Sequence, residues 1–460
     1  MSRLRYCTSP RLARAAASLL AASLFALSLA ASAADYYVSP DGNDERGDGS
    51  RSRPWRSLQR AADTVGPGDT VHVADGAYEP FHIETSGKPG RPIRFRAMGT
   101  AAVISGTRVF DERPVAISVL ASHVVIEGFR VRVSPTPRDG RTRGIRISGT
   151  YRRHVTGVHV IRNRVENAGW VGITTSYADD VVIEDNVVSG SYREHGIYLA
   201  NSGDRAVVRR NIVFDNAEAG IQLNADPHQP GDGISSGNLI AGNVLYRNGR
   251  HGSAAINLAS VRDSVIANNL IYDNYAQGIA AWDDEAGDGY GSKNNLFAHN
   301  TVVMPAGNRR HALSLRHGST GNVVKNNILL HLGSGDSLAV DASSLPGLVS
   351  DHNLLTRIED TSGRIVGLRE WQASRNLDRR SIGVDADTLF VDPGSGNYMI
   401  RPGSPAHDAG DPSVGIEADI ANTPRPQGRA PDIGAYEIPA PLSPRASAGI
   451  QDGGGITKSR

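Results

Sequence analysis

The sequence predicts an all-β solenoid, in which short strands stack coil upon coil, and two recurring patterns carry that prediction. In one pattern a small residue precedes a branched apolar residue, and in the other an asparagine stands two positions before one. Short β-branched runs such as 181–184 (V-V-I-E), bounded by Asn, Asp and Gly, are typical of strands. Patterns that return every roughly 23 to 35 residues indicate coils that bury their apolar sides against one another. We expect the recurring asparagines to stack as a ladder at one corner and bond the turn backbone of adjacent coils. The first pattern occurs at Gly144, Gly172, Gly196, Gly220, Ala255, Gly278 and Ala312, and the second at Asn163, Asn186, Asn211, Asn243, Asn269, Asn300 and Asn327.

Both ends of such a solenoid need a cap, because an open end exposes an apolar cross-section and free strand edges. Residues 54–63 predict one amphipathic helix at the N-terminal end, with Pro54 near its first turn. Past residue 340 the repeat fades, and 404–411 and 431–437 predict a closing segment that packs back on the solenoid. The apolar side of the predicted helix carries Trp55, Leu58, Ala61 and Ala62.

The first residues predict export. A basic stretch precedes an apolar run from Ala15 to Ala30, and Ala31-Ser32-Ala33 fits the small-residue cleavage rule. We therefore expect a secreted or periplasmic protein with no membrane span once this signal is removed. The sole cysteine, Cys7, lies inside the signal, so the mature chain contains no disulfide.

We expect five regions along the chain and a monomer. The regions are a signal peptide (1–33), an N-terminal cap with the first coils (34–110), a β-helix with a groove (111–340), C-terminal coils with the closing segment (341–437) and a disordered tail (438–460).

We expect no nucleic-acid partner, because the chain lacks a basic excess. The chain has 49 basic and 48 acidic residues, and removing the four signal arginines leaves 45 basic residues against 48 acidic ones. This balance lacks the basic footprint that nucleic acid requires. Arginine carries nearly all of the positive charge, and its planar guanidinium suits the recognition of carboxylates.

The repeat resembles the right-handed parallel β-helix of the pectate-lyase-like superfamily, over nearly the whole mature chain. Residues 36–44 (Y-Y-V-S-P-D-G-N-D) resemble the opening of secreted polysaccharide lyases of this type, including the family-nine pectate lyases. The resemblance implies a right-handed parallel β-helix that acts on an acidic polysaccharide. Lyases of families six and nine use a lysine base, but Lys293 and Lys325 are the only lysines in the repeat region, which favours histidine or tyrosine here.

Two interrupted coils locate the predicted groove. Four coils place 14 or 15 residues between the first pattern and the next asparagine, whereas Gly220 to Asn243 spans 23 and Gly278 to Asn300 spans 22. The extra residues, 225–233 and 283–293, leave the same edge of the solenoid two coils apart. We expect them to form walls on either side of a trough, because long loops on a rigid scaffold concentrate function.

Strand alternation predicts which side chains line this trough. Residues between the buried aliphatic positions must point outward, in two rows that run along the solenoid. Their hydrogen-bonding groups and aromatic ring suit a sugar polymer, and we expect Arg146, Gln222, Asn224, Asn257, Trp282 and Arg316 to bind substrate. The first row is Arg146, Thr174, Tyr198, Gln222, Asn257, Ala280 and Ser314, and the second is Ser148, Ser176, Ala200, Asn224, Ala259, Trp282 and Arg316.

Three residues are the predicted catalytic groups. His195 is a candidate base and Tyr198, on the following strand, a candidate acid. His228 lies in an Asp-Pro-His tripeptide similar to one that carries a catalytic histidine in alginate C5-epimerases, although Gln229 departs from that motif. His251 is a weaker candidate on the opposite lip.

Acidic residues in the two loops predict a cation site. Ca²⁺ accepts six to eight oxygen ligands from loops of this kind. We therefore expect Ca²⁺ at Asp226, Asp232, Asp283 and Asp284.

These features together favour a lyase that cleaves a uronate-containing polysaccharide by β-elimination. Two other classes stay open, because one fold serves many functions. The first is another carbohydrate enzyme in the same groove, either a C5-epimerase or a hydrolase with paired carboxylates such as Asp283 and Asp284. The second is a non-catalytic polysaccharide-binding protein or adhesin.

Overall fold

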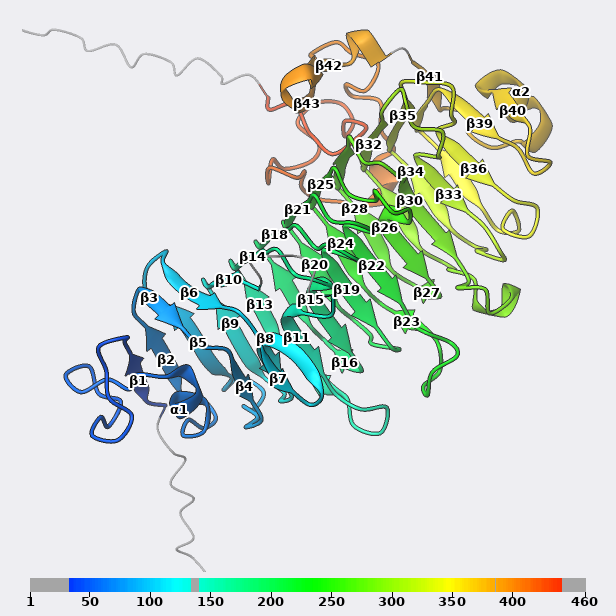
Figure 1. Ribbon diagram of the computed structural model, residues 1–460. Coiled ribbons are helices and arrows are strands. Elements are labelled where there is room, and N and C mark those ends of the chain that lie inside the picture. The colour runs from blue at the N-terminus through cyan, green and yellow to red at the C-terminus, as the bar shows by residue number, and fades with distance from the viewer. Residues whose placement is uncertain (1–32, 134–139, 385, 441–460) are drawn as a thin grey trace, which may run out of the picture.

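The computed structural model describes residues 33–133, 140–384 and 386–440. The strands wind into a parallel β-helix of about 11 turns, with three long sheets along its length (Figure 1). No helix among the described residues is long and apolar enough to cross a membrane. The predicted signal peptide lies almost entirely outside the described residues, as do positions 441–460 of the predicted tail.

Each coil contributes one strand to each sheet. The first sheet contains β1 (Asp35–Val38), β2 (Thr70–Val73), β5 (Ile93–Ala97), β9 (Val124–Glu127), β13 (His159–Ile161), β17 (Val182–Glu184), β20 (Val207–Arg209), β24 (Leu239–Ala241), β28 (Val265–Ala267), β31 (Leu296–Ala298), β34 (Val323–Lys325) and β37 (Val349–Asp351). The second sheet contains β3 (Gly76–Tyr78), β6 (Ala102–Ser105), β10 (Arg130–Arg132), β14 (Arg164–Glu166), β18 (Val187–Ser189), β21 (Ile212–Phe214), β25 (Val244–Tyr246), β29 (Leu270–Tyr272), β32 (Thr301–Met304), β35 (Ile328–His331), β38 (Leu354–Leu355) and β41 (Ile382–Gly383).

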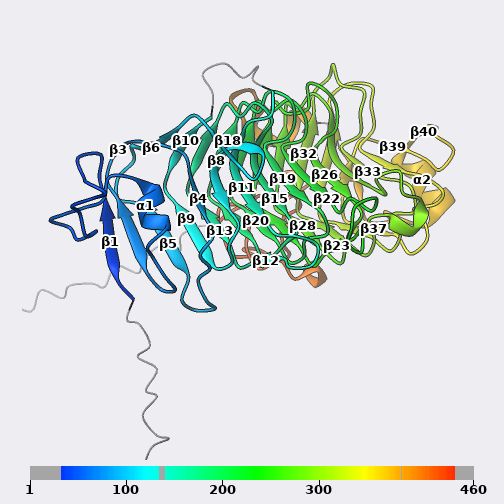
Figure 2. The same ribbon diagram turned by 60° about the horizontal axis from the view of Figure 1, so that its bottom comes forward.

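The third sheet, called the groove sheet below, runs along the length of the solenoid (Figure 2). It contains β4 (Phe81–Ile83), β8 (Arg113–Val119), β11 (Arg143–Ser148), β15 (Val171–Ser176), β19 (Ile197–Ala200), β22 (Ile221–Asn224), β26 (Ala254–Ala259), β30 (Gln277–Trp282), β33 (Leu313–Leu315), β36 (Leu338–Val340), β39 (Arg357–Glu359) and β40 (Ile365–Gly367), with β7 (Arg108–Phe110) paired to β8. Three short pairs lie outside the long sheets: β12 (Val155–Thr156) with β16 (Ala178–Asp179), β23 (Ser235–Ser236) with β27 (Val261–Arg262), and β42 (Phe390–Asp392) with β43 (Asn397–Ile400).

The first sequence pattern marks a corner where coils pack closely. A Cβ at Gly196 would lie 2.5 Å from Val213 Cγ1 and 2.8 Å from the carbonyl oxygen of Gly220. The corner therefore requires a small residue. The branched residue that follows, Ile197, is fully buried in the core.

The second pattern forms the predicted asparagine ladder. Asn186 Nδ2 donates to Asn211 Oδ1 at 3.0 Å, and Asn211 Nδ2 donates to Asn243 Oδ1 at the same distance. Each of these oxygens also accepts the backbone N–H of the preceding asparagine. Successive rungs are mostly 25 to 27 residues apart, but 32 and 31 residues where the two insertions occur.

The N-terminal cap differs from the predicted helix at its start. Helix α1 (Leu58–Ala62) begins after Ser57, whose side chain accepts the N–H of Arg60, so the prediction of a helix from Pro54 was wrong. Trp55 precedes the helix and stacks on Tyr36, with ring centroids 5.0 Å apart. At the other end the unpredicted helix α2 (Leu368–Arg375) follows the antiparallel strand β40 and buries Trp371.

Residues beyond 386 lie against the side of the last coils (orange to red in Figure 1). Ala435 N–H donates to Thr301 Oγ1 at 2.9 Å, and Lys325 pairs with Asp411 at 2.7 Å. A buried ion pair joins Arg425 to Glu437 at 2.8 Å. This segment therefore covers a face of the second sheet.

Candidate active-site groove

Strand register confirms both predicted outward rows. On the groove sheet Tyr198 pairs with Gln222, and Gln222 pairs with Asn257. In the second row Asn224 pairs with Ala259, which pairs with Trp282. The aliphatic residues on either side of the first row, and those that precede the second row, are buried in the core, so these side chains lie on the outer face of the sheet.

A chain of hydrogen bonds divides this face into two hollows. Trp282 Nε1 donates to Asn257 Oδ1 at 3.0 Å, and Asn257 Nδ2 donates to Gln222 Oε1 at 2.8 Å. Neighbouring side chains cover Gln222 and Asn257, which are only 5% and 7% exposed. The prediction of one open trough between the two loops was therefore wrong. Two hollows lie instead, one on each side of this polar bridge.

Arginines line the larger hollow, which has a volume of about 620 Å³. Arg143 lies 4.0 Å from the ring centroid of Trp170. Burial, together with the charges of Arg113 and Arg146, lowers the pKa of Arg143 to about 10. Arg146 Nη2 pairs with Asp111, while its Nη1 is buried without a hydrogen-bond partner among the described residues. Three guanidinium groups in one hollow favour an anionic ligand.

The smaller hollow, of 310 Å³, lies towards the C-terminal end of the groove sheet. Trp282 and Asn257 line it together with Ser314 and Arg316. Arg316 Nη2 donates to Glu359 at 2.6 Å, so its charge is already paired. An indole beside polar side chains presents the mixed surface that sugar rings prefer.

Tyr198 lies between the arginine-lined hollow and the first loop. Burial raises the pKa of its phenol, and the charges of Asp226, Glu194 and Asp284 raise that pKa further. Asn224 lies within hydrogen-bonding reach of both Tyr198 and Asp284. The phenol is therefore held protonated and can donate a proton.

His195 lies deeper than the sequence suggested, with 8% of its surface exposed. Its Nδ1 accepts the backbone N–H of Ala219 at 3.2 Å, and its ring meets that of Tyr198 edge-on at 4.9 Å. Burial lowers its pKa to about 3, so the ring is neutral with its proton on Nε2. This arrangement leaves no free lone pair for proton abstraction and suits a residue that positions Tyr198.

The two predicted loops meet over the end of β26. A Cβ at Gly233 in the first loop would lie 3.0 Å from the Tyr290 ring in the second. Burial raises the pKa of Asp226 to about 6, and the charge of Asp284 adds to the shift. His228 is exposed, and its charge lowers the pKa of both carboxyl groups. The meeting point is thus a coupled acidic pair with a nearby histidine.

A family model for the Pel9A-like right-handed β-helix region matches residues 36–328. The chain belongs to the Pel9A-like right-handed β-helix family. It is 26% identical over 445 residues to the uncharacterized protein YwoF of Bacillus subtilis (strain 168), covering 81% of this chain and 92% of that protein. It is 39% identical over 78 residues to pectate lyase PEL9 of Emericella nidulans, covering 16% of this chain and 19% of that protein. Its fold is similar to the crystal structure of pectate lyase Pel9A (TM-score 0.58, 15% identity, 88% of this chain and 96% of that one).

In this Pel9A-like protein the four predicted calcium ligands have different surroundings. Asp283 accepts the N–H groups of Glu285 and Gly287 and contacts His317 Nδ1 at 3.0 Å. Asp232 is exposed and accepts the N–H of Ile234. Asp284 interacts electrostatically with both Asp226 and Asp283.

Neither repeat-region lysine of this family member lies in the groove hollows. Lys325 belongs to the first sheet, where it pairs with Asp411. Lys293 is the last residue of the second loop and donates to the carbonyl oxygen of Gly289 at 3.4 Å. That the base is a residue other than lysine therefore stays a prediction. The positions of the two lysines favour it.

Sequence reasoning missed an acidic pair on the opposite lip of the groove. Burial raises the pKa of both Glu194 and Glu218. The charge of Glu218 raises the pKa of Glu194 further, whereas the charge of His251 lowers the pKa of Glu218. Both glutamates stand two positions before the glycine of the first pattern, a signal that the sequence did contain. Arg113 was missed because the pattern was recognised only from Gly144 onward, although Ala116-Ile117 in the same strand fits it.

Proposed function

We propose that this protein is a secreted lyase that binds a uronate-containing polysaccharide in the groove and cleaves it by β-elimination. The main support is the arginine-lined hollow beside the protonated Tyr198, with the buried, unpartnered Nη1 of Arg146. A carboxylate on a sugar ring would satisfy that donor and offset the repulsion among the guanidinium groups.

The proposed reaction uses the arginines first. Neutralising the uronate carboxylate stabilises the charge that develops when the C5 proton leaves. A base takes that proton, a double bond forms between C4 and C5, and the C4–O bond breaks. The electron pair departs with the leaving oxygen, which Tyr198 protonates.

Two predicted catalytic histidines, His195 and His228, are the candidates for the base. We assign the role of base to His228, because it lies near Asp226 and its side chain is already exposed to an incoming substrate. His195 is reassigned from base to positioning residue, since its Nδ1 lone pair is already occupied.

Ca²⁺ remains part of the proposal, and its proposed site is the place where the two loops meet. Asp226 and Asp284 with the amide oxygen of Asn224 would supply the oxygen ligands that Ca²⁺ prefers. A bound calcium ion would supply additional positive charge for the substrate carboxylate.

Hydrolysis is the second candidate, and one observation favours it. Asp226, with its pKa raised to about 6, stands beside Asp284, and glycosidases pair a protonated carboxyl group with a second carboxylate. The pair proposed from sequence, Asp283 with Asp284, is replaced here because the Asp283 carboxylate is held by backbone N–H groups.

The test is incubation of the purified protein with polygalacturonate, alginate and glucuronan, and with neutral xylan for comparison. We expect the ultraviolet absorbance of an unsaturated uronate to rise with an acidic polymer only. New reducing ends without that absorbance would indicate a hydrolase, and altered sugar configuration at constant chain length an epimerase. Binding without any change would indicate a non-catalytic protein.

Substitution of Arg146 tests the role of the arginine hollow. Arg146→Gln should lower kcat/KM by about 10- to 100-fold, because it removes a charged hydrogen bond to the carboxylate. Arg164→Gln is the matched control, since Arg164 lies on the second sheet and pairs with Glu166. Equal activity of the two variants would refute carboxylate recognition at Arg146.

A further inference from the structure

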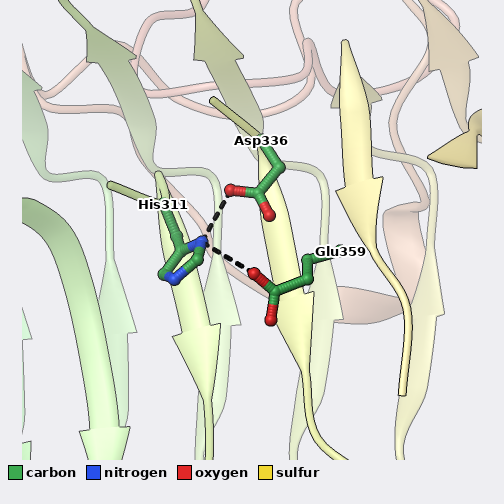
Figure 3. A group of neighbouring side chains, drawn as sticks. All are labelled: His311, Asp336 and Glu359. Carbon is green, nitrogen blue, oxygen red and sulfur yellow. Dashed lines mark hydrogen bonds and ion pairs between the residues drawn. The ribbon is translucent and has the colours of Figure 1, made fainter. Parts of the chain in front are cut away.

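Three potential metal ligands converge near the C-terminal end of the groove sheet, outside the proposed catalytic cluster (Figure 3). His311, Asp336 and Glu359 come from three consecutive coils, those of β33, β36 and β39. His311 Nδ1 lies 2.6 Å from Asp336 Oδ1 and 4.0 Å from Glu359 Oε2. One ligand atom from each residue lies within 4.8 Å of the others.

Asp336 carries an unsatisfied oxygen in this cluster. The residue is 2% exposed, and its Oδ2 has no hydrogen-bond partner among the described residues. In Figure 3 this carboxylate and that of Glu359 face each other beside the imidazole ring. A buried carboxylate oxygen is costly unless a donor or a cation satisfies it.

The surrounding charges leave room for a cation. Arg316 Nη2 donates to Glu359 Oε1 at 2.6 Å and lies 3.2 Å from His311 Nε2. Because the guanidinium donates to Nε2, the imidazole is neutral with its proton on Nδ1. One arginine against two carboxylates gives these four side chains a net charge of −1. Arg316 thus holds the outer oxygen of Glu359 and leaves Oε2 towards Asp336.

We propose that His311 Nδ1, Asp336 and Glu359 bind one divalent transition-metal ion, of the Zn²⁺ or Mn²⁺ class. An imidazole with two carboxylates suits these ions, whereas Ca²⁺ prefers an all-oxygen set. The ion displaces the Nδ1 proton of His311 and joins three consecutive coils where the parallel stack ends. It stabilises this end of the solenoid, and the proposal is independent of the groove chemistry.

A second cluster, His407, Asp408 and Asp432, provides the comparison. There Asp432 Oδ1 accepts the N–H of Asp408 and Oδ2 accepts the N–H of Ile438, both at 2.7 Å. With both carboxylate oxygens satisfied, this cluster lacks the feature that distinguishes Asp336.

The test is titration of the full chain, after treatment with a chelator, with Zn²⁺ and separately with Mn²⁺. Isothermal calorimetry and elemental analysis should show one equivalent of at least one of these ions, and its binding should raise Tm. Asp336→Asn keeps the shape of the side chain and should weaken binding more than about 100-fold, beyond the loss typical of a residue that only supports a ligand. His407→Gln should bind as the wild type does.

Asp336→Asn changes a buried group, so its folding is checked by circular dichroism. Glu359→Gln is the second variant, because it changes a less buried ligand. Glu359 is partly exposed, and its variant should also lose the metal and the rise in Tm. Absence of stoichiometric binding by the wild type would overturn the proposal. So would full affinity in folded Glu359→Gln, or loss of the ion in His407→Gln.

Discussion

Tyr198 and Asp226 share a polar cluster in which burial disfavours the charged form of both side chains. The neighbouring carboxylates act in the same direction, because a like charge raises the pKa of an acid. The phenol keeps its proton at neutral pH, whereas the carboxyl group of Asp226 keeps its proton up to about pH 6. Residue-level chemistry in this groove therefore depends on which groups are held neutral.

Tyr198→Phe tests the proposed acid directly. Removing the phenolic proton should lower kcat by about 100-fold or more, since general acid catalysis typically contributes that much. KM should change little, because the ring and its contact with His195 remain. Steady-state kinetics on the active polymer measure both constants. Tyr246→Phe, in the stacked aromatic row of the second sheet, is the matched control and should keep full activity.

Asp226 predicts a pH dependence of stability. Its pKa is about 6 in the folded protein against an ordinary value of 3.8, so between these pH values the folded protein holds a proton that the unfolded chain releases. Its contribution to stability therefore falls as the pH rises from about 4 to about 6. Below both pKa values the carboxyl group is protonated in either state and no such loss exists.

Asp226→Asn removes this dependence. The Tm of the variant minus that of the wild type should increase between about pH 4 and pH 7, as measured by calorimetry. Asp360→Asn is the comparison, because hydrogen bonds from Ser362 lower the pKa of Asp360 to about 2 and place its titration below this window. A difference for Asp226→Asn that is constant across the window would contradict the shifted pKa.

At the scale of the element, each coil is held to the next by its buried asparagine. Asn243 Oδ1 accepts the N–H of Asn211, and Asn243 Nδ2 donates to the carbonyl oxygen of Val208 at 2.9 Å. These side chains satisfy backbone groups that a strand turning a corner cannot pair with other strands. The ladder is therefore structural, and it keeps its register even where the insertions lengthen a coil.

Asn243→Ala should destabilise the protein by about 2–6 kcal/mol. The variant leaves the N–H of Asn211 and the carbonyl of Val208 buried without these partners, at about 1–3 kcal/mol for each. Urea unfolding measures the loss. Ile212→Ala changes an exposed residue on the preceding coil and should cost far less, so equal losses would show that the ladder bonds contribute little.

At the scale of the whole molecule, the C-terminal segment ties distant parts of the chain together. Arg425 donates to Glu437 and to the carbonyl oxygens of Asp432 and Gly434, and both members of the ion pair are 1% exposed. Breaking a buried pair is costly because one charge is left uncompensated. In a solenoid such damage stays local, since each coil contacts mainly its neighbours.

Arg425→Met should lower the free energy of unfolding by about 3–5 kcal/mol. Hydrogen exchange should accelerate at the amides of β32 and β35, which the segment contacts, and stay unchanged in β5. Arg364→Met is the control, because the pair of Arg364 with Glu370 is exposed to solvent and contributes little to stability. Uniform acceleration along the chain would instead indicate one cooperative unit.

The sequence by itself determined the fold, the asparagine ladder and the two outward rows. Alternation along a strand has a fixed period of two, so Tyr198, Gln222 and Asn257 could be placed on one outer face without knowing what surrounds them. Coil length likewise located both insertions. These features follow from local geometry that every coil repeats.

The tertiary structure alone decided burial and partnership. The next coil offers an N–H to Nδ1 of His195, and Asp226 lies near Asp284 because two loops meet. The His311, Asp336 and Glu359 cluster likewise depends on three coils being in register. Such contacts join residues far apart in the chain, and local sequence patterns carry no record of the distance or the dielectric between them.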